Sequence, residues 1–129
     1  ALFRAPELAA LTAGDREVDA DDWRRHAEVE GPEDQARWFW EVVADASPGD
    51  RGALLRFSTG APCAPVGGFS KLAPPFKLQI NLYDQNYQHL PTAATCFNTI
   101  QMPAYPSKSL LSARVLAAAR YGSEGFVFA

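Results

Sequence analysis

An alternating run of side chains over residues 76–83 limits most strongly what this chain can fold into. Every second position in the run is apolar: Phe76, Leu78, Ile80 and Leu82. Side chains of a β-strand point alternately to the two faces of its sheet, so this pattern predicts a strand with one buried face. A second strand is predicted over residues 96–102, because Pro103 cannot continue the ladder of backbone hydrogen bonds. Both strands need a layer of other elements over their apolar face.

Helical patterns precede and follow these two strands. Residues 34–46 carry apolar side chains at helical spacing, namely Ala36, Phe39, Trp40 and Val43. Helix starts are predicted at the N-cap residues Asp19, Ser47 and Ser107. Helices come first and strands follow with a closing helix, which predicts an α+β domain with helices packed on a small β-sheet.

Composition narrows the class of protein further. The chain has 129 residues, of which 47% are hydrophobic and 12% aromatic, enough for one domain with a packed core. No apolar run approaches the roughly 20 residues of a membrane helix. Lysine and arginine are scattered, which argues against nucleic-acid binding. No secretion signal is evident, so we expect the protein in the cytosol or the nucleus.

Charge is distributed unevenly along the chain. Residues 1–50 carry 13 acidic and 5 basic side chains, whereas residues 51–129 carry 2 acidic and 7 basic ones. We expect the two halves to attract each other within one fold, although a basic surface that faces a partner is an alternative.

Two cysteines are the candidates for chemistry. Cys96 follows a loop and opens the second predicted strand, where a thiol is accessible, and thiolate is a good nucleophile for acyl exchange. From position alone, an inert buried thiol remains the alternative for Cys96. Cys63 lies in a proline-rich loop and is expected to have no catalytic role. A thiol hydrolase would require His89 within hydrogen-bond reach of Cys96. No spacing suited to a structural zinc site occurs, and two reduced thiols are expected.

Five separated segments carry a family pattern in the right order. They are Trp38-Phe39-Trp40-Glu41-Val42-Val43, Leu55-x-Phe57-x-Thr59-Gly60 with Pro65-x-Gly67-Gly68-Phe69, Leu90-Pro91-x-Ala93-x-Thr95-Cys96-Phe97-Asn98, Pro103-x-Tyr105 and Glu124-Gly125-Phe126. Together they resemble the catalytic C-terminal lobe of HECT-type ubiquitin ligases. Ala94 departs from the pattern, since many members have histidine there.

The resemblance implies a division of the chain. Residues 1–14 would be the last helix of the N-terminal lobe, residues 15–18 the hinge between lobes, and residues 19–129 the C-terminal lobe. The chain would then be a fragment, and we expect it to load ubiquitin slowly or not at all without the N-terminal lobe, which holds the E2-docking surface in this family.

The resemblance also implies a reaction and its partners. Cys96 would accept ubiquitin from an E2 enzyme as a thioester and pass it to a lysine of a protein substrate, with no metal or organic cofactor. Supporting roles would fall to Leu90, Pro91, Thr95, Asn98 and Phe126. Alternation predicts that Phe97 packs into the core. The alternative from another class is a non-catalytic module that binds ubiquitin or another partner without using Cys96.

Overall fold

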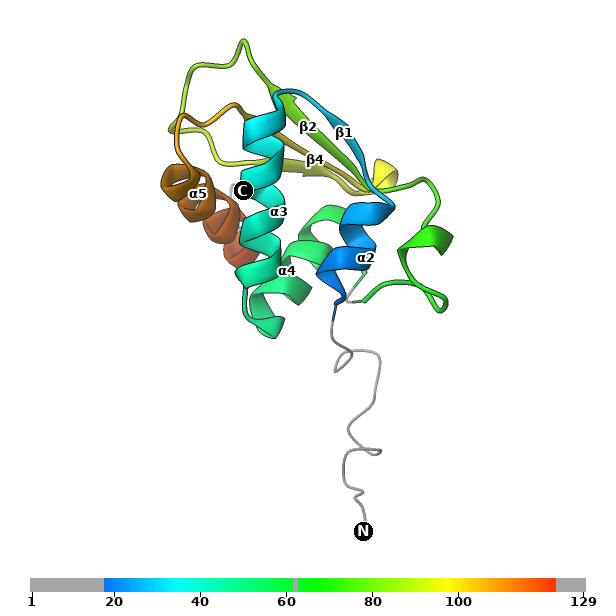
Figure 1. Ribbon diagram of the computed structural model, residues 1–129. Helices are drawn as coiled ribbons and strands as arrows, with labels where there is room; N and C mark the ends of the chain where they lie inside the picture. Colours follow the sequence, from blue (N-terminus) through cyan, green and yellow to red (C-terminus); the bar gives the residue numbers. More distant parts are fainter. Residues whose placement is uncertain (1–17, 62, 123–129) are drawn as a thin grey trace.

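The computed structural model describes residues 18–61 and 63–122, and these form an α+β fold as predicted (Figure 1). The described helices are α2 (Ala20–Arg25), α3 (Glu33–Asp45), α4 (Pro48–Thr59) and α5 (Lys108–Gly122). The strands are β1 (Glu28–Glu30), β2 (Lys77–Asn81), β3 (Thr92–Ala94) and β4 (Thr99–Pro103). Two short 3₁₀ turns, η2 (Phe69–Lys71) and η3 (Thr95–Phe97), complete the described elements.

The four strands form one mixed sheet in the order β1-β2-β4-β3. β1, β2 and β4 run parallel, and β3 returns antiparallel to β4, so that β1 and β3 form the two edges. The helices cover one face of this sheet, with α3 crossing in front of it and α4 and α5 alongside (Figure 1). The other face carries polar side chains, which follows from the alternation that the sequence shows along β2.

Aromatic rings fill the space between the helices and the sheet. Trp23 is fully buried and stacks on Phe69 with ring centroids 5.2 Å apart. Phe76, directly before β2, meets the same indole edge to face at 5.2 Å. Trp40 packs edge to face against Phe39 at 4.9 Å. Such contacts bury a large apolar area, so this cluster ties α2, α3 and the loop around η2 to the sheet.

Local capping signals set several helix ends as predicted. The side chain of Asp19 accepts hydrogen bonds from the backbone N–H groups of residues 21 and 22. Ser47 caps α4 in the same way, and Gly60 ends that helix in the left-handed conformation. Ser107 accepts a hydrogen bond from the N–H of Leu110 at the start of α5. These bonds satisfy backbone donors that a helix start leaves without intrahelical partners.

Arg51 joins the start of the described chain to the helices. Its guanidinium donates to the carbonyls of Val43, Ala44 and Ala46 at the end of α3, at 2.9, 2.9 and 3.1 Å. A fourth bond of 3.0 Å reaches the carbonyl of Val18, whose side chain is buried. One planar side chain thus holds the last turn of α3 and the segment before α2.

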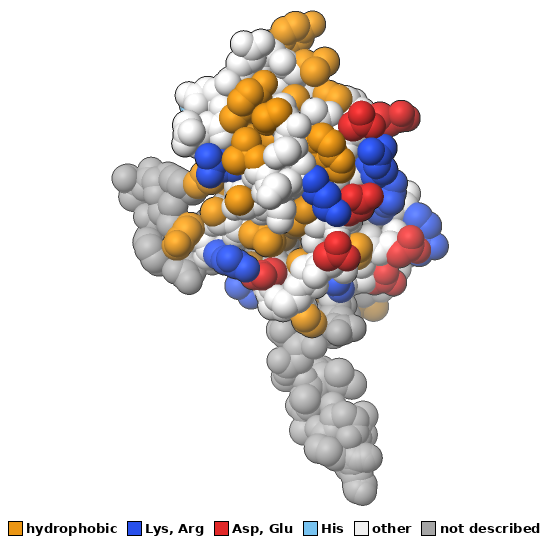
Figure 2. All heavy atoms as spheres, turned by 60° about the vertical axis from the view of Figure 1, so that its left-hand side comes forward, with side chains coloured by type: hydrophobic (Ala, Val, Ile, Leu, Met, Phe, Trp, Pro, Cys, Tyr) orange, Lys and Arg blue, Asp and Glu red, His pale blue; other side chains and the backbone are white. Residues whose placement is uncertain are grey.

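Ion pairs link the acidic and basic halves of the chain, as expected from the charge distribution. Arg120 on α5 forms a two-pronged pair with Asp50 on α4, at 2.9 and 3.1 Å. Lys108 pairs with Glu41 at 2.9 Å. The hydrogen bond from Arg120 lowers the pKa of the Asp50 carboxyl, and the bond to Lys108 does the same for Glu41. Figure 2 shows acidic and basic side chains next to each other along one side of the molecule.

Three sequence-based expectations about the elements were wrong. No strand was predicted at residues 28–30, where β1 pairs with β2. The strand expected from residue 96 begins only at Thr99, because η3 interrupts it. Leu82 is 58% exposed, since β2 ends at Asn81 before the alternation does. Within the described residues, no helix is long and apolar enough to cross a bilayer.

The expected helix over residues 1–14, nearly all of the expected hinge and Phe126 lie outside the described residues. Of the hinge, only Val18 is described.

Candidate active site at the Cys96 turn

Cys96 lies in the turn that joins the two antiparallel strands β3 and β4. The last strand pair before the turn is Ala94 with Thr99, and η3 occupies the space between them. Cys96 is exposed, and so are its neighbours Thr95 and Phe97. Another protein can reach a thiol at the tip of a hairpin, whereas it cannot reach a thiol in the interior.

Asn98 fixes the shape of this turn. Its backbone adopts the left-handed conformation with φ 51°, which asparagine tolerates better than most residues. Its side-chain amide donates a 2.7 Å hydrogen bond to the carbonyl of Pro74, and its own carbonyl accepts from the N–H of Lys77 at 2.9 Å. The turn is therefore anchored to the preceding loop and to β2, so Cys96 sits on a rigid support.

Phe97 is not in the core, contrary to the prediction from alternation. Its side chain is 66% exposed beside the thiol, because η3 and the left-handed residue after it break the period of two. It lines a hollow of about 350 Å³ on the polar face of the sheet, together with Ala94, Gln101 and others. The site thus presents an aromatic surface next to Cys96.

The segment before β3 is held in place from behind. Pro91 is fully buried and Leu90 is half-buried. Tyr105, whose ring is fully buried, donates a hydrogen bond from its hydroxyl to the carbonyl of His89, and burial raises the pKa of this phenol. Sequence reasoning placed Tyr105 in a motif without giving it a function; the structure shows that it secures the approach to the Cys96 turn.

His89 and Cys96 do not act on each other in this structure. The imidazole of His89 contacts the Asp84 carboxylate at 3.3 Å and the Asn86 amide at 3.1 Å. These partners lie in the loop at one end of β3, whereas Cys96 follows its other end, and three extended residues span about 10 Å. The backbone N–H of Asn86 and the imidazole lower the pKa of Asp84. The arrangement offers no base to Cys96 from His89.

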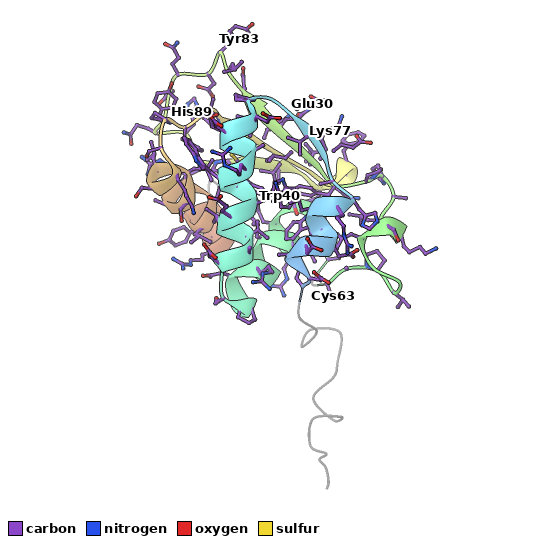
Figure 3. All side chains as sticks on the ribbon, in the orientation of Figure 1. Glu30, Trp40, Cys63, Lys77, Tyr83 and His89 are labelled. Carbon is purple, nitrogen blue, oxygen red and sulfur yellow. The ribbon has the colours of Figure 1, made fainter. Side chains whose placement is uncertain are left out.

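Cys63 lies apart from the Cys96 turn, in the loop after α4 (Figure 3). The two cysteines are not joined by a disulfide in this structure. Within residues 18–61 and 63–122, no group of three histidine, cysteine or acidic side chains is arranged to hold a metal ion.

Comparison of the sequence with known proteins identifies its family. The model of the HECT-domain (ubiquitin-transferase) family matches residues 1–129. The chain belongs to the HECT-domain family. The E3 ubiquitin-protein ligase HACE1 of Bos taurus and of Homo sapiens is 38% identical over 135 aligned residues, covering 99% of this chain. The ligase ptr1 of Schizosaccharomyces pombe is 35% identical over 134 residues.

The match covers only part of each relative. This HECT chain spans 15% of the length of the HACE1 proteins and 4% of ptr1. The family-model match confirms the family resemblance inferred from separated sequence motifs. The α+β architecture is consistent with the C-terminal part of a HECT domain.

Proposed function

We propose that this chain is the ubiquitin-carrying lobe of a HECT ligase and that Cys96 forms the thioester. The observation that supports this most directly is the exposed thiol on a hairpin turn that Asn98 anchors to the rest of the sheet. The name of the family, ubiquitin-transferase, supplies the class of reaction.

The reaction consists of two acyl transfers. The Cys96 thiolate attacks the carbonyl carbon of the thioester between ubiquitin and an E2 enzyme, and the E2 thiolate leaves. The amine of a substrate lysine then attacks the new thioester, Cys96 leaves as thiolate, and the amine gives up a proton to solvent or a nearby base. Exchange between two thioesters is close to neutral in energy, so correct positioning governs the first step. The second step forms a more stable amide and runs forward.

Residues around the turn divide the supporting roles. Asn98 holds the turn, while Pro91 and Leu90 fix the segment that leads into β3. Thr95 is exposed beside the thiol and is a candidate hydrogen-bond donor to the acyl group. Phe126 is proposed to act in lysine transfer, so Phe126→Ala should load ubiquitin normally and transfer it slowly.

The proposed division of the chain follows the same reasoning. Residues 1–14 would belong to the N-terminal lobe, residues 15–18 to the hinge and residues 19–129 to the catalytic lobe. E2 docking is assigned to the N-terminal lobe, so the chain alone should load far more slowly than the two-lobe ligase. Rapid single-turnover loading of the isolated chain would contradict this division.

The deciding experiment uses the two-lobe ligase with E1, a matched E2, ubiquitin and ATP. Wild type, Cys96→Ala and Cys63→Ala are compared on a non-reducing gel with and without added thiol. A thiol-sensitive ubiquitin adduct that disappears only in Cys96→Ala supports the proposal. Absence of any adduct with several E2 enzymes would instead identify a binding module, and loss with Cys63→Ala would identify the other thiol.

A further inference from the structure

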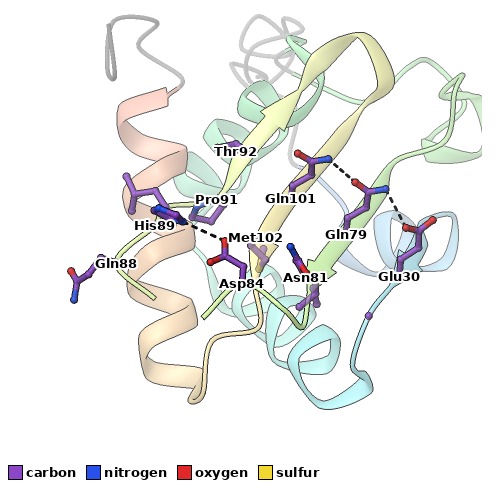
Figure 4. A pocket seen from close by; sticks show the side chains of 13 residues that line it. Glu30, Gln79, Asn81, Asp84, Gln88, His89, Pro91, Thr92, Gln101 and Met102 are labelled. Carbon is purple, nitrogen blue, oxygen red and sulfur yellow. Dashed lines mark hydrogen bonds and ion pairs between the residues drawn. The ribbon is translucent and has the colours of Figure 1, made fainter. Parts of the chain in front are cut away.

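The polar face of the sheet carries a straight row of four side chains, one from each strand. Glu30 on β1 is in register with Gln79 on β2, Gln79 with Gln101 on β4, and Gln101 with Thr92 on β3. We call these four residues the polar row. Figure 4 shows Glu30, Gln79 and Gln101 pointing out from the sheet on the same side, joined by hydrogen bonds.

Hydrogen bonding gives the polar row a direction. A carboxylate only accepts, so the amide nitrogen of Gln79 must donate to Glu30, which it does at 3.1 Å. The oxygen of Gln79 then accepts from the amide nitrogen of Gln101 at 2.7 Å. The remaining oxygen of Gln101 points away from Gln79, towards the β3 side of the row (Figure 4). The row therefore ends on an acceptor and favours a hydrogen-bond donor there.

A groove of about 930 Å³ runs along the whole polar row, and the loop after β2 forms its wall at the β3 end. We call it the sheet groove; its polar lining includes Gln101, Thr92, Asp84 and His89. The backbone N–H of Asn86 and the His89 imidazole lower the pKa of the Asp84 carboxyl. None of the residues lining the groove is lysine or arginine. Arg114 reaches the loop from α5 but binds the carbonyl of Tyr87 and the side chain of Gln88. The groove thus combines a carboxylate with acceptor oxygens and suits a cation.

Glu30 contributes less charge to the groove than Asp84. Lys77 pairs with Glu30 at 3.3 Å on the outer face of β1 and β2, and Figure 3 shows the two residues next to each other. Asp84 contacts the His89 imidazole at 3.3 Å and has no lysine or arginine partner among the described residues, so the negative charge of the groove is concentrated at its Asp84 end.

The sheet groove also leads towards Cys96. The smaller hollow beside Phe97 shares Gln79 and Gln101 with it, so the two form one continuous surface along the sheet. Cys96 follows Thr92 of the polar row by two further strand residues and part of a 3₁₀ turn. This length of chain spans about 10 Å. An extended peptide covers that length with about three residues.

We propose that the sheet groove binds a basic, extended segment of the protein that accepts ubiquitin. A lysine or arginine of that segment sits between the Gln101 oxygen and Asp84, while the lysine that reacts lies about three positions away, at Cys96. The inference rests on the proposed function of Cys96, because it assigns the second substrate of that reaction. Under this proposal, a lysine accepts ubiquitin more readily when another basic residue lies about three positions away in the same protein.

Binding is tested first, with the chain itself and without ubiquitin. A fluorescent Gly/Ser peptide with two lysines about three positions apart is titrated against wild type, Asp84→Asn, Gln101→Lys and Asp21→Asn. Asp84→Asn keeps the oxygen that accepts from Asn86, so the loop retains its bond. Asp21 lies on α2, pairs with Arg25 and does not line the groove, so its variant matches the change in charge.

We expect Asp84→Asn to weaken peptide binding about fivefold, as for one partly exposed charge, and Gln101→Lys to abolish it. Two controls accompany these variants. The Asp21→Asn chain should bind the two-lysine peptide as tightly as wild type does. A peptide with one lysine replaced by norleucine should bind wild type as weakly as the two-lysine peptide binds Asp84→Asn. Equal binding of both peptides would overturn the proposal. So would equally tight binding of free spermine, which would indicate a pocket for small polyamines.

Transfer is tested second, in the two-lobe ligase charged with ubiquitin in a single turnover. Asp84→Asn should load at the wild-type rate, react normally with hydroxylamine and transfer to the two-lysine peptide about fivefold more slowly. Slower loading, or equal slowing with hydroxylamine, would reject the groove as an acceptor site. If no thioester forms on Cys96, the proposed function fails, while the binding titration still judges the groove.

Discussion

Replacing Asn98 tests whether the Cys96 turn is held as the structure indicates. Alanine at this position would have to adopt φ 51° without the tolerance of asparagine, which costs about 1–2 kcal/mol. It would also lose the 2.7 Å bond to the carbonyl of Pro74, worth about 1 kcal/mol net. The two effects together predict a loss of about 2–3 kcal/mol in the free energy of unfolding.

Glycine separates the two contributions. Asn98→Gly loses the same hydrogen bond but accepts the left-handed conformation, so it should cost only about 1–1.5 kcal/mol. Urea unfolding of the chain, followed by circular dichroism, measures both variants. If alanine cost no more than glycine, the strain argument would be wrong; if both cost under about 0.5 kcal/mol, the bond to Pro74 would contribute nothing measurable.

The same structure makes three further predictions. Gly31→Ala should destabilise the chain by about 2 kcal/mol or more, because the new Cβ would lie 2.6 Å from a backbone oxygen of β2 at φ 126°; Gly52→Ala, with open space around it, is the matched control in thermal melts. Arg51→Met should cost about 2–4 kcal/mol in urea unfolding, since four carbonyls lose a charged donor. Arg120→Ala should lose stability at neutral pH. Its loss of stability relative to wild type should shrink below about pH 4. The pKa of Asp50 is lower in the folded than in the unfolded chain, so the Arg120 pair stabilises the fold at pH values above the unfolded pKa. This contribution disappears as the pH falls and Asp50 becomes protonated.

Each of these predictions has a contrary result. Equal melting temperatures for Gly31→Ala and Gly52→Ala would mean that the backbone of β1 and β2 adjusts freely. A loss below about 0.5 kcal/mol for Arg51→Met would show that water replaces the guanidinium. A deficit of Arg120→Ala that stays constant down to pH 2 would exclude Asp50 as the source of the effect.

Signals that lie within a few neighbouring residues were predictable from the sequence. The caps at Asp19, Ser47 and Ser107 form as expected, since each bond joins a side chain to a backbone group two or three residues away. The alternation at the start of β2 was equally local. Membership of the HECT family was also predictable, because its motifs are spread along the chain in a fixed order.

Features that depend on partners far away in the chain were not predictable. β1 is three exposed residues whose strand partner is the parallel neighbour β2, almost 50 positions later, and its own sequence carries no strand pattern. The break in the strand after Cys96 did leave a trace, because asparagine at position 98 is a residue type that favours the left-handed conformation. The sheet groove combines side chains from four strands and a loop, which no single stretch of sequence contains.

Arg51 connects the point where the described chain begins to the helices that support the Cys96 side of the fold. Under the proposed boundary at residues 15–18, the connection enters the lobe at Val18, whose carbonyl Arg51 holds together with the end of α3. A rotation of the described part about this proposed connection would carry Cys96 with it, because Arg51 ties the entry point to the helices. Under the same proposal, lengthening the connector before Val18 would extend the reach of Cys96 and leave the Arg51 contacts within the described part unchanged.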